Sequence, residues 1–149
     1  MTAPRPLAVR DARGFQHSND QYYYRPLVAG DAIFTYVAHV PAGGDMPPSE
    51  EEAKLFELSL FMLEGELDCS LSGDQVTVRA GEGLHIPLNA PFGVNNRTDR
   101  SATFVLSFSP PPRVGGIQQM FTDAEERGRR IFEPAEFADI IGESSFPLR

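Results

Sequence analysis

The sequence predicts an all-β fold, a small antiparallel β-barrel with short helices at its C-terminal end. Short stretches of alternating apolar side chains recur from residue 32 to residue 108, and turn residues separate them at fairly even spacing. The 13 Gly and 13 Pro supply the many turns that such a chain of short strands needs. Beyond residue 112 the apolar period changes to that of helices. With 149 residues, 41% of them apolar, the chain suffices for one domain with a packed core.

Residues 1–30 are expected to form an N-terminal arm. Residues 1–21 are polar and contain Pro, Gly and Asn, so they are predicted to hold at most a short strand or turn. The aromatic run from Tyr22 to Tyr24 favours a β-strand. Pro26 is expected to break this strand, and a turn at Gly30 and Asp31 leads into the barrel.

Residues 31–112 are predicted to form the barrel itself. Its first strand, Ala32 to Val40, carries Phe34, Tyr36, Ala38 and Val40 on one face and Ile33, Thr35, Val37 and His39 on the other. Because both faces are largely apolar, this strand is expected to be covered on both sides. Further strands are predicted at residues 58–63, 66–71, 75–79, 84–86, 94–96 and 102–108, with a hairpin turn at residues 72–74.

Residues 113–149 are predicted to form a helical segment packed on the barrel. Thr122 and Glu125 fit a capping box, which predicts a helix that starts at Thr122 and ends near Arg130. Pro134 suits the first turn of a second short helix, which Gly142 is expected to end.

Two blocks of the chain resemble the conserved motifs of the cupin family. The first block, residues 41–67, keeps the proline pair and the glycine of the family motif, at Pro47, Pro48 and Gly65. The second block, residues 81–96, keeps Gly81, Pro87 and Asn96. The resemblance covers about residues 33–109 and is strongest to small, single-domain, quercetin-dioxygenase-like cupins. Together with the strand count and the turn spacing, it implies an antiparallel jelly-roll (cupin) β-barrel in one domain.

The resemblance does not extend to the metal ligands of the family. The two histidine positions of the first block fall on Ser49 and Glu51, the glutamate position on Leu58, and the histidine of the second block on Phe92. A mononuclear metal needs three or four nitrogen or oxygen donors at one point, and Leu58 and Phe92 offer none. We therefore expect a degenerate metal site with no metal and no other cofactor. Glutamates 50–52 are donors suited to a hard cation, although such a run is more typical of a solvated turn.

Strand alternation assigns a set of side chains to the interior, because the ligand positions of the family point into the barrel. The expected pocket-lining residues are Phe34, Tyr36, Val40, Met46, Ser49, Leu58, Leu60, Met62 and Phe92. Such a lining is either a pocket for a small, largely apolar organic molecule or a filled core.

Three residues are the candidates for acid–base chemistry: Tyr36, His85 and Glu51. Tyr36 bonds a backbone carbonyl, or it has a functional role, in which it orients a ligand or acts as a proton donor. His85 is either a hydrogen-bonded histidine of the sheet or one half of a metal pair with His39 on the outside of the barrel. His17 lies in the polar arm and is interpreted as an ordinary surface residue.

Charge and composition limit the partners. The net charge of −8 argues against nucleic acid or an anionic membrane. The N-terminus lacks the apolar run of a signal peptide, and no apolar run approaches the roughly 20 residues that span a membrane, so a cytoplasmic protein is expected.

The single cysteine, Cys69, excludes an intrachain disulfide and is predicted to be a buried core thiol. The apolar outer faces of strands 32–40 and 58–63 predict a homodimer.

Three functional hypotheses follow from these observations. The favoured one is a small-molecule-binding cupin that lacks the usual metal ligands, with a non-enzymatic or vestigial site. The second is a metal-independent dehydratase, isomerase or cyclase that uses Tyr36 with a histidine or a glutamate. The third is a metal-dependent, dioxygenase-like enzyme with unconventional ligands.

Overall fold

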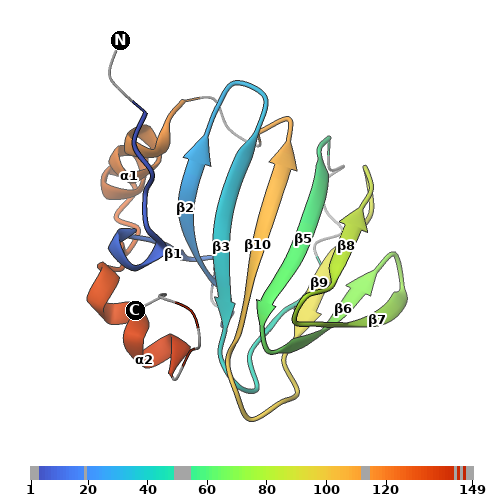
Figure 1. Cartoon of the computed structure of the whole chain (residues 1–149). Coiled ribbons are helices and arrows are strands. Elements are labelled where there is room, and N and C mark those ends of the chain that lie inside the picture. The colour runs from blue at the N-terminus through green and yellow to red at the C-terminus, as the bar shows by residue number, and fades with distance from the viewer. Residues whose placement is uncertain are drawn as a thin grey trace.

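The computed structural model of the protein describes residues 4–18, 20–48, 55–111, 115–142, 144 and 146. Its strands form a six-stranded and a four-stranded antiparallel sheet, and the buried side chains of both sheets belong to one hydrophobic core. The larger sheet has the order β1 (Phe15–Gln16), β2 (Tyr23–Ala29), β3 (Phe34–Val40), β10 (Ala102–Ser109), β5 (Glu57–Glu64) and β8 (Gly83–Ile86). The smaller sheet has the order β4 (Asp45–Met46), β9 (Phe92–Asn95), β6 (Glu66–Leu71) and β7 (Asp74–Arg79). The predicted all-β fold of the jelly-roll type is confirmed (Figure 1).

The middle strands of the larger sheet follow the predicted alternation. Strand β10 lies between β3 and β5, so that Leu106 is opposite Tyr36 on one side and Leu60 on the other. In β5, Leu58, Leu60 and Met62 are buried, whereas every second residue between them is exposed. The apolar pattern of β5 therefore determined which face turns to the core.

The hairpin between β6 and β7 is tighter than the predicted three-residue turn. Leu71 pairs with Asp74, which leaves only Ser72 and Gly73 in the turn. Both have positive φ, 50° for Ser72 and 89° for Gly73. Two-residue hairpin turns that match the twist of the strands require this left-handed backbone, and glycine adopts it without a steric penalty. Cys69 in β6 is fully buried, as predicted.

Within the first 30 residues, Phe15–Gln16 and Tyr23–Ala29 are strands of the larger sheet, which differs from the arm that the sequence suggested. The predicted break at Pro26 is wrong, since β2 continues through Pro26 to Ala29 with a register shift after it. Strand β1 pairs only with Tyr23 and Tyr24, so β2 is an edge strand at Pro26, where a residue without an N–H is tolerated. Phe15 also joins the main core and stacks on Phe121 with 4.8 Å between the ring centroids.

Two short helices lie beside the β1–β2 edge of the larger sheet, α1 (Ile117–Glu126) and α2 (Phe137–Ile141), the latter preceded by a 3₁₀ turn at Pro134–Glu136 (Figure 1). The predicted capping box is wrong, because α1 begins after Gly116 and Thr122 lies inside it, where its hydroxyl donates to the Gln118 carbonyl at 3.1 Å. Gly142, with φ 68°, ends α2 as predicted. Within the part of the chain described, neither helix has the length and apolarity needed to cross a lipid bilayer.

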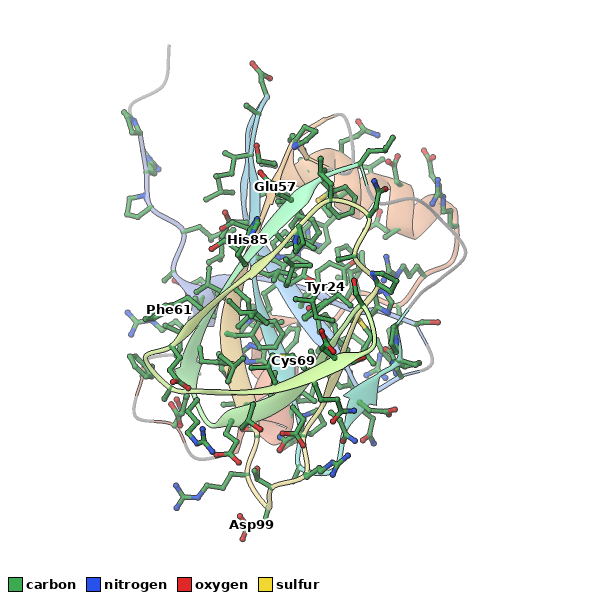
Figure 2. All side chains as sticks on the ribbon, turned by 90° about the vertical axis from the view of Figure 1, so that its right-hand side faces the viewer. Tyr24, Glu57, Phe61, Cys69, His85 and Asp99 are labelled. Carbon is green, nitrogen blue, oxygen red and sulfur yellow. The ribbon has the colours of Figure 1, made fainter. Side chains whose placement is uncertain are left out.

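Of the two outer strand faces on which the dimer prediction rests, that of β5 is exposed, whereas Val37 and His39 on that of β3 are buried by the chain itself. Phe61, 46% exposed, points away from the core opposite Val105 of β10 (Figure 2). We expect light scattering to give twice the 16.4 kDa chain mass, and Phe61→Glu to give the monomer mass with an unchanged melting temperature. Val76→Glu, at a 40% exposed position of the smaller sheet, is the control and should stay dimeric. A wild-type monomer at micromolar concentration would contradict the prediction.

Candidate functional site

An aromatic cavity of about 270 Å³ lies at one end of the barrel. Five of the predicted pocket residues line it: Phe34, Tyr36, Met46, Leu58 and Phe92. The sequence analysis did not assign the other main contributors to the cavity: His17, Tyr22, Tyr24, Phe56, Leu106, Phe108 and Met120. Residues of both sheets, of α1 and of the N-terminal segment therefore meet at this cavity.

Three other predicted pocket residues, Val40, Leu60 and Met62, are fully buried in the core but do not line the cavity. The strand register explains the difference. Phe34, Phe108 and Leu58 lie side by side at the cavity end of the larger sheet, whereas Val40 and Met62 lie at the opposite ends of their strands. Alternation predicts the face of a strand on which a side chain lies, but not its depth in the barrel. The remaining predicted positions, Ser49 and Glu51, lie outside the described residues.

The cavity wall is a packed group of rings. Tyr36 is at its centre, with centroid distances of 4.7 Å to Tyr24, 5.9 Å to Phe34 and 5.3 Å to Phe108. Phe56 also contacts Phe108 at 5.2 Å. Aromatic rings attract one another over such distances in tilted and edge-to-face arrangements. The wall is therefore a largely apolar surface of aromatic rings that pack on one another.

A pair of buried hydroxyl groups is the main polar feature of this wall. The Tyr22 and Tyr36 hydroxyl oxygens are 2.6 Å apart, so one hydroxyl donates to the other. Burial raises the pKa of both phenols well above the ordinary value, and both stay neutral at physiological pH. Their mutual bond uses one of the two O–H protons, and the other has no acceptor among the described residues. The partner of Tyr36 is thus a second tyrosine and not a backbone carbonyl.

A histidine–carboxylate pair lies at the rim of the same cavity. The turn between β1 and β2, closed by a 2.8 Å bond from the His17 N–H to the Tyr22 carbonyl, brings His17 beside Asp20. The His17 Nδ1 is 2.9 Å from the Asp20 Oδ2, and the His17 and Tyr22 rings pack edge to face with 5.7 Å between their centroids. The His17 side chain is 48% exposed and that of Asp20 only 11%. The sequence signal for this pair was the three-residue spacing of His17 and Asp20 just before an aromatic strand. The interpretation of His17 as an ordinary surface residue overlooked this signal.

The residues of the cavity do not fit a mononuclear metal. Leu58 and Phe92, at two of the four ligand positions of the family, turn hydrocarbon side chains to the cavity. Over residues 4–48 (without 19), 55–111 and the described C-terminal part, no group of three or more His, Cys, Asp or Glu side chains is arranged to hold a metal. The glutamates 50–52 lie outside the described residues, so the predicted absence of a metal stays a prediction.

The other two histidines lie away from the cavity. His85 on β8 bonds Glu57 on β5 (Nε2 to Oε1, 3.0 Å) on the outer face, where the two side chains are 65% and 57% exposed (Figure 2). His39 on β3 is fully buried and 2.9 Å from the Thr103 hydroxyl. Strands β10 and β5 separate β3 from β8, so His39 and His85 form no metal pair.

Two facing antiparallel sheets with a small cavity at one end define a β-barrel of the jelly-roll type. The family model of the cupin domain matches residues 36–108, and the chain belongs to the cupin superfamily. No curated protein matches the sequence.

Solved structures of several cupin-fold proteins are similar to this chain in fold. An RmlC-like cupin from Shewanella frigidimarina has a TM-score of 0.64 at 14% identity, over 74% of this chain and 95% of that one. The polyketide cyclase RemF from Streptomyces resistomycificus has a TM-score of 0.65 at 19% identity, over 77% and 86% of the two chains. KdgF from Halomonas sp. has a TM-score of 0.63 at 11% identity, over 74% and 96%. At these identities the likeness concerns the fold alone.

Proposed function

We propose that this cupin binds a small, flat, largely apolar and neutral organic molecule that carries one acceptor oxygen. The observation that carries the proposal is the Tyr22–Tyr36 pair, which leaves one O–H proton without an acceptor among the described residues in an otherwise apolar wall. A buried donor without a partner costs free energy, and a carbonyl or ether oxygen of a ligand would remove this cost.

The size and charge of the cavity narrow the class of ligand. A volume of about 270 Å³ is just below the usual range of ligand pockets and suits one or two fused rings. Among the residues described as lining the cavity there is no Lys or Arg. A carboxylate or phosphate would therefore be buried without a counter-charge, which disfavours anionic ligands.

The metal-dependent alternative has weaker support. The cupin family model describes the superfamily as a whole, so it does not select the quercetin-dioxygenase-like subgroup. A dioxygenase of that type would need donors where Leu58 and Phe92 face the cavity. Binding at a degenerate metal site is therefore the function that we propose for this cavity.

A matched pair of probes tests the proposal, 2-tetralone and its oxygen-free analogue tetralin. We expect 2-tetralone to bind roughly five- to tenfold more tightly, because one net hydrogen bond is worth about 1 kcal/mol. The double variant Tyr22→Phe with Tyr36→Phe should remove this preference and leave the affinity for tetralin within about twofold. Tyr23→Phe is the control, since Tyr23 packs on Phe132 outside the cavity.

Ligand-observed NMR and thermal shifts measure both affinities. The proposal is wrong if neither probe binds, or if the preference for the ketone survives in the double variant. Elemental analysis of protein purified without a chelating column adds an independent criterion, for which we expect far less than one transition-metal ion per chain. A stoichiometric metal would show that the site has ligands other than those proposed.

A further inference from the structure

The His17–Asp20 pair is not needed for binding an apolar ligand, yet its histidine lines the same cavity as the tyrosine pair. A carboxylate can only accept a hydrogen bond, so the His17 Nδ1 carries the hydrogen in the 2.9 Å contact with Asp20. The lone pair of the neutral imidazole is then on Nε2. A histidine held in this tautomer by a carboxylate has the arrangement of a general base.

Tyr22 connects the two polar pairs. Its ring meets the imidazole edge of His17 at a centroid distance of 5.7 Å, and its hydroxyl is 2.6 Å from that of Tyr36. Asp20 is close enough that its charge contributes to raising the pKa of both phenols. The Oδ1 atom of Asp20 is buried and has no hydrogen-bond partner among the described residues. A base and a neutral O–H donor thus lie along one side of a cavity the size of a small molecule.

We propose that the cavity is a metal-independent enolisation site for small cyclic ketones, with His17 as the base and the Tyr22–Tyr36 pair as the donor to the carbonyl oxygen. The inference rests on the proposed binding of a flat molecule with one acceptor oxygen. His17 and the two tyrosines are the catalytic residues of this proposal, since they touch the substrate. Asp20 is a positioning residue that acts through His17.

The proposed step is a proton transfer without any oxidant or reductant. The Nε2 atom of His17 takes a proton from the carbon next to the carbonyl, and the electrons of that C–H bond form the carbon–carbon double bond. The π electrons of the carbonyl move onto its oxygen, where the tyrosine O–H stabilises the developing charge among largely apolar side chains. The resulting imidazolium returns the proton to the enolate at carbon or at oxygen. The net reaction interconverts the ketone and its enol.

The chain contains a matched control for this pair. His85 and Glu57 form a histidine–carboxylate contact of nearly the same length, 3.0 Å, but on the exposed outer face. Neither residue lines the cavity. Any exchange that results from a histidine on the protein surface should therefore depend on His85 as much as on His17.

Deuterium exchange of 2-tetralone in D₂O, followed by proton NMR, tests the proposal. We expect wild-type protein to accelerate exchange at the carbons next to the carbonyl above the buffer rate. His17→Asn, whose amide can still donate to Asp20, should lower kcat/KM at least about a hundredfold while binding of 2-tetralone stays within about twofold. His85→Asn should leave the exchange rate unchanged. Free imidazole added to His17→Ala should restore part of the rate, which a merely structural role of His17 would not allow.

The outcomes separate this inference from the proposed function. If 2-tetralone binds but exchanges at the buffer rate, the enolisation site is refuted and the binding function stands. Equal exchange by the wild type and His17→Asn also refutes it. If 2-tetralone does not bind at all, both proposals are overturned. Loss of exchange in His17→Asn, with retained binding and imidazole rescue, supports the assignment of His17 as the base.

Discussion

Replacing Phe92 with alanine is expected to lower the free energy of unfolding by about 3–5 kcal/mol. Phe92 begins β9 opposite Leu71 of β6, and its side chain is buried in the core between the two sheets. Truncating it removes a buried ring and joins the vacated space to the existing cavity of about 270 Å³. The surrounding strands are held by the ladders of both sheets, so they cannot collapse to fill this space.

Urea denaturation of the wild type and of two variants measures this effect. Phe92→Leu keeps most of the apolar volume and should lose less than about 1.5 kcal/mol. A loss below about 1 kcal/mol in Phe92→Ala would show that Phe92 does not support the core. Because the change enlarges the cavity, we also expect the alanine variant to bind 2-tetralone more weakly.

Acidification should destabilise the fold through His39. Burial, and to a smaller extent the charge of Arg25, lower the pKa of His39 from its ordinary value of 6.5 to about 3 in the folded protein. The unfolded chain therefore binds a proton near pH 6.5, whereas the folded protein stays unprotonated to about pH 3. Stability from this group is complete above pH 6.5 and is lost as the pH falls towards 3, by about 2 kcal/mol between pH 7 and pH 5 and about 4 kcal/mol by pH 3.

The packing around the His39 imidazole explains why its pKa is lowered. His39 lies under α2, with its ring 5.7 Å from that of Phe137, and its Nε2 has no hydrogen-bond partner among the described residues. The Arg25 guanidinium lies over the same Phe137 ring at 4.3 Å. A proton on His39 would therefore place a second positive charge in the buried region that already holds the Arg25 guanidinium.

The comparison of pH profiles with His39→Gln isolates this contribution. Glutamine can still bond the Thr103 hydroxyl but does not titrate, so the variant should lack the loss of about 2 kcal/mol between pH 7 and pH 5. His85→Gln, at an exposed position, should keep the wild-type profile. Parallel profiles for the wild type and His39→Gln would contradict the predicted pKa.

Much of the fold could be predicted from local patterns. The alternation of β5 was sufficient to turn Leu58 and Leu60 inward and leave Phe61 outside. A hairpin turn at residues 72–74 was visible from residue types, although only the structure shows that Ser72 and Gly73 alone form it. These features depend on neighbours along the chain, for which the physics of a strand or a turn is enough.

The predicted helix start at Thr122 was wrong because it relied on neighbours along the chain, whereas contacts with distant residues decided where the helix begins. The residues that favour a capping box were present, but α1 begins five residues earlier, after Gly116. A favourable cap contributes only about 1 kcal/mol, and burial of Met120 and Phe121 against the core contributes more. Tertiary packing therefore decided where the helix starts.

The sequence alone determined most strands of the barrel, the faces of their side chains and the loss of metal donors at Leu58 and Phe92. Only the tertiary structure decided how deep each inward side chain lies, and that the hydroxyls of Tyr22 and Tyr36 meet. It also decided that His17 reaches the cavity rim beside Asp20, and that α2 buries His39. The physical reason is that the face of a side chain depends on the two-residue period of its own strand, whereas its depth and its partners depend on the register between strands far apart in the chain.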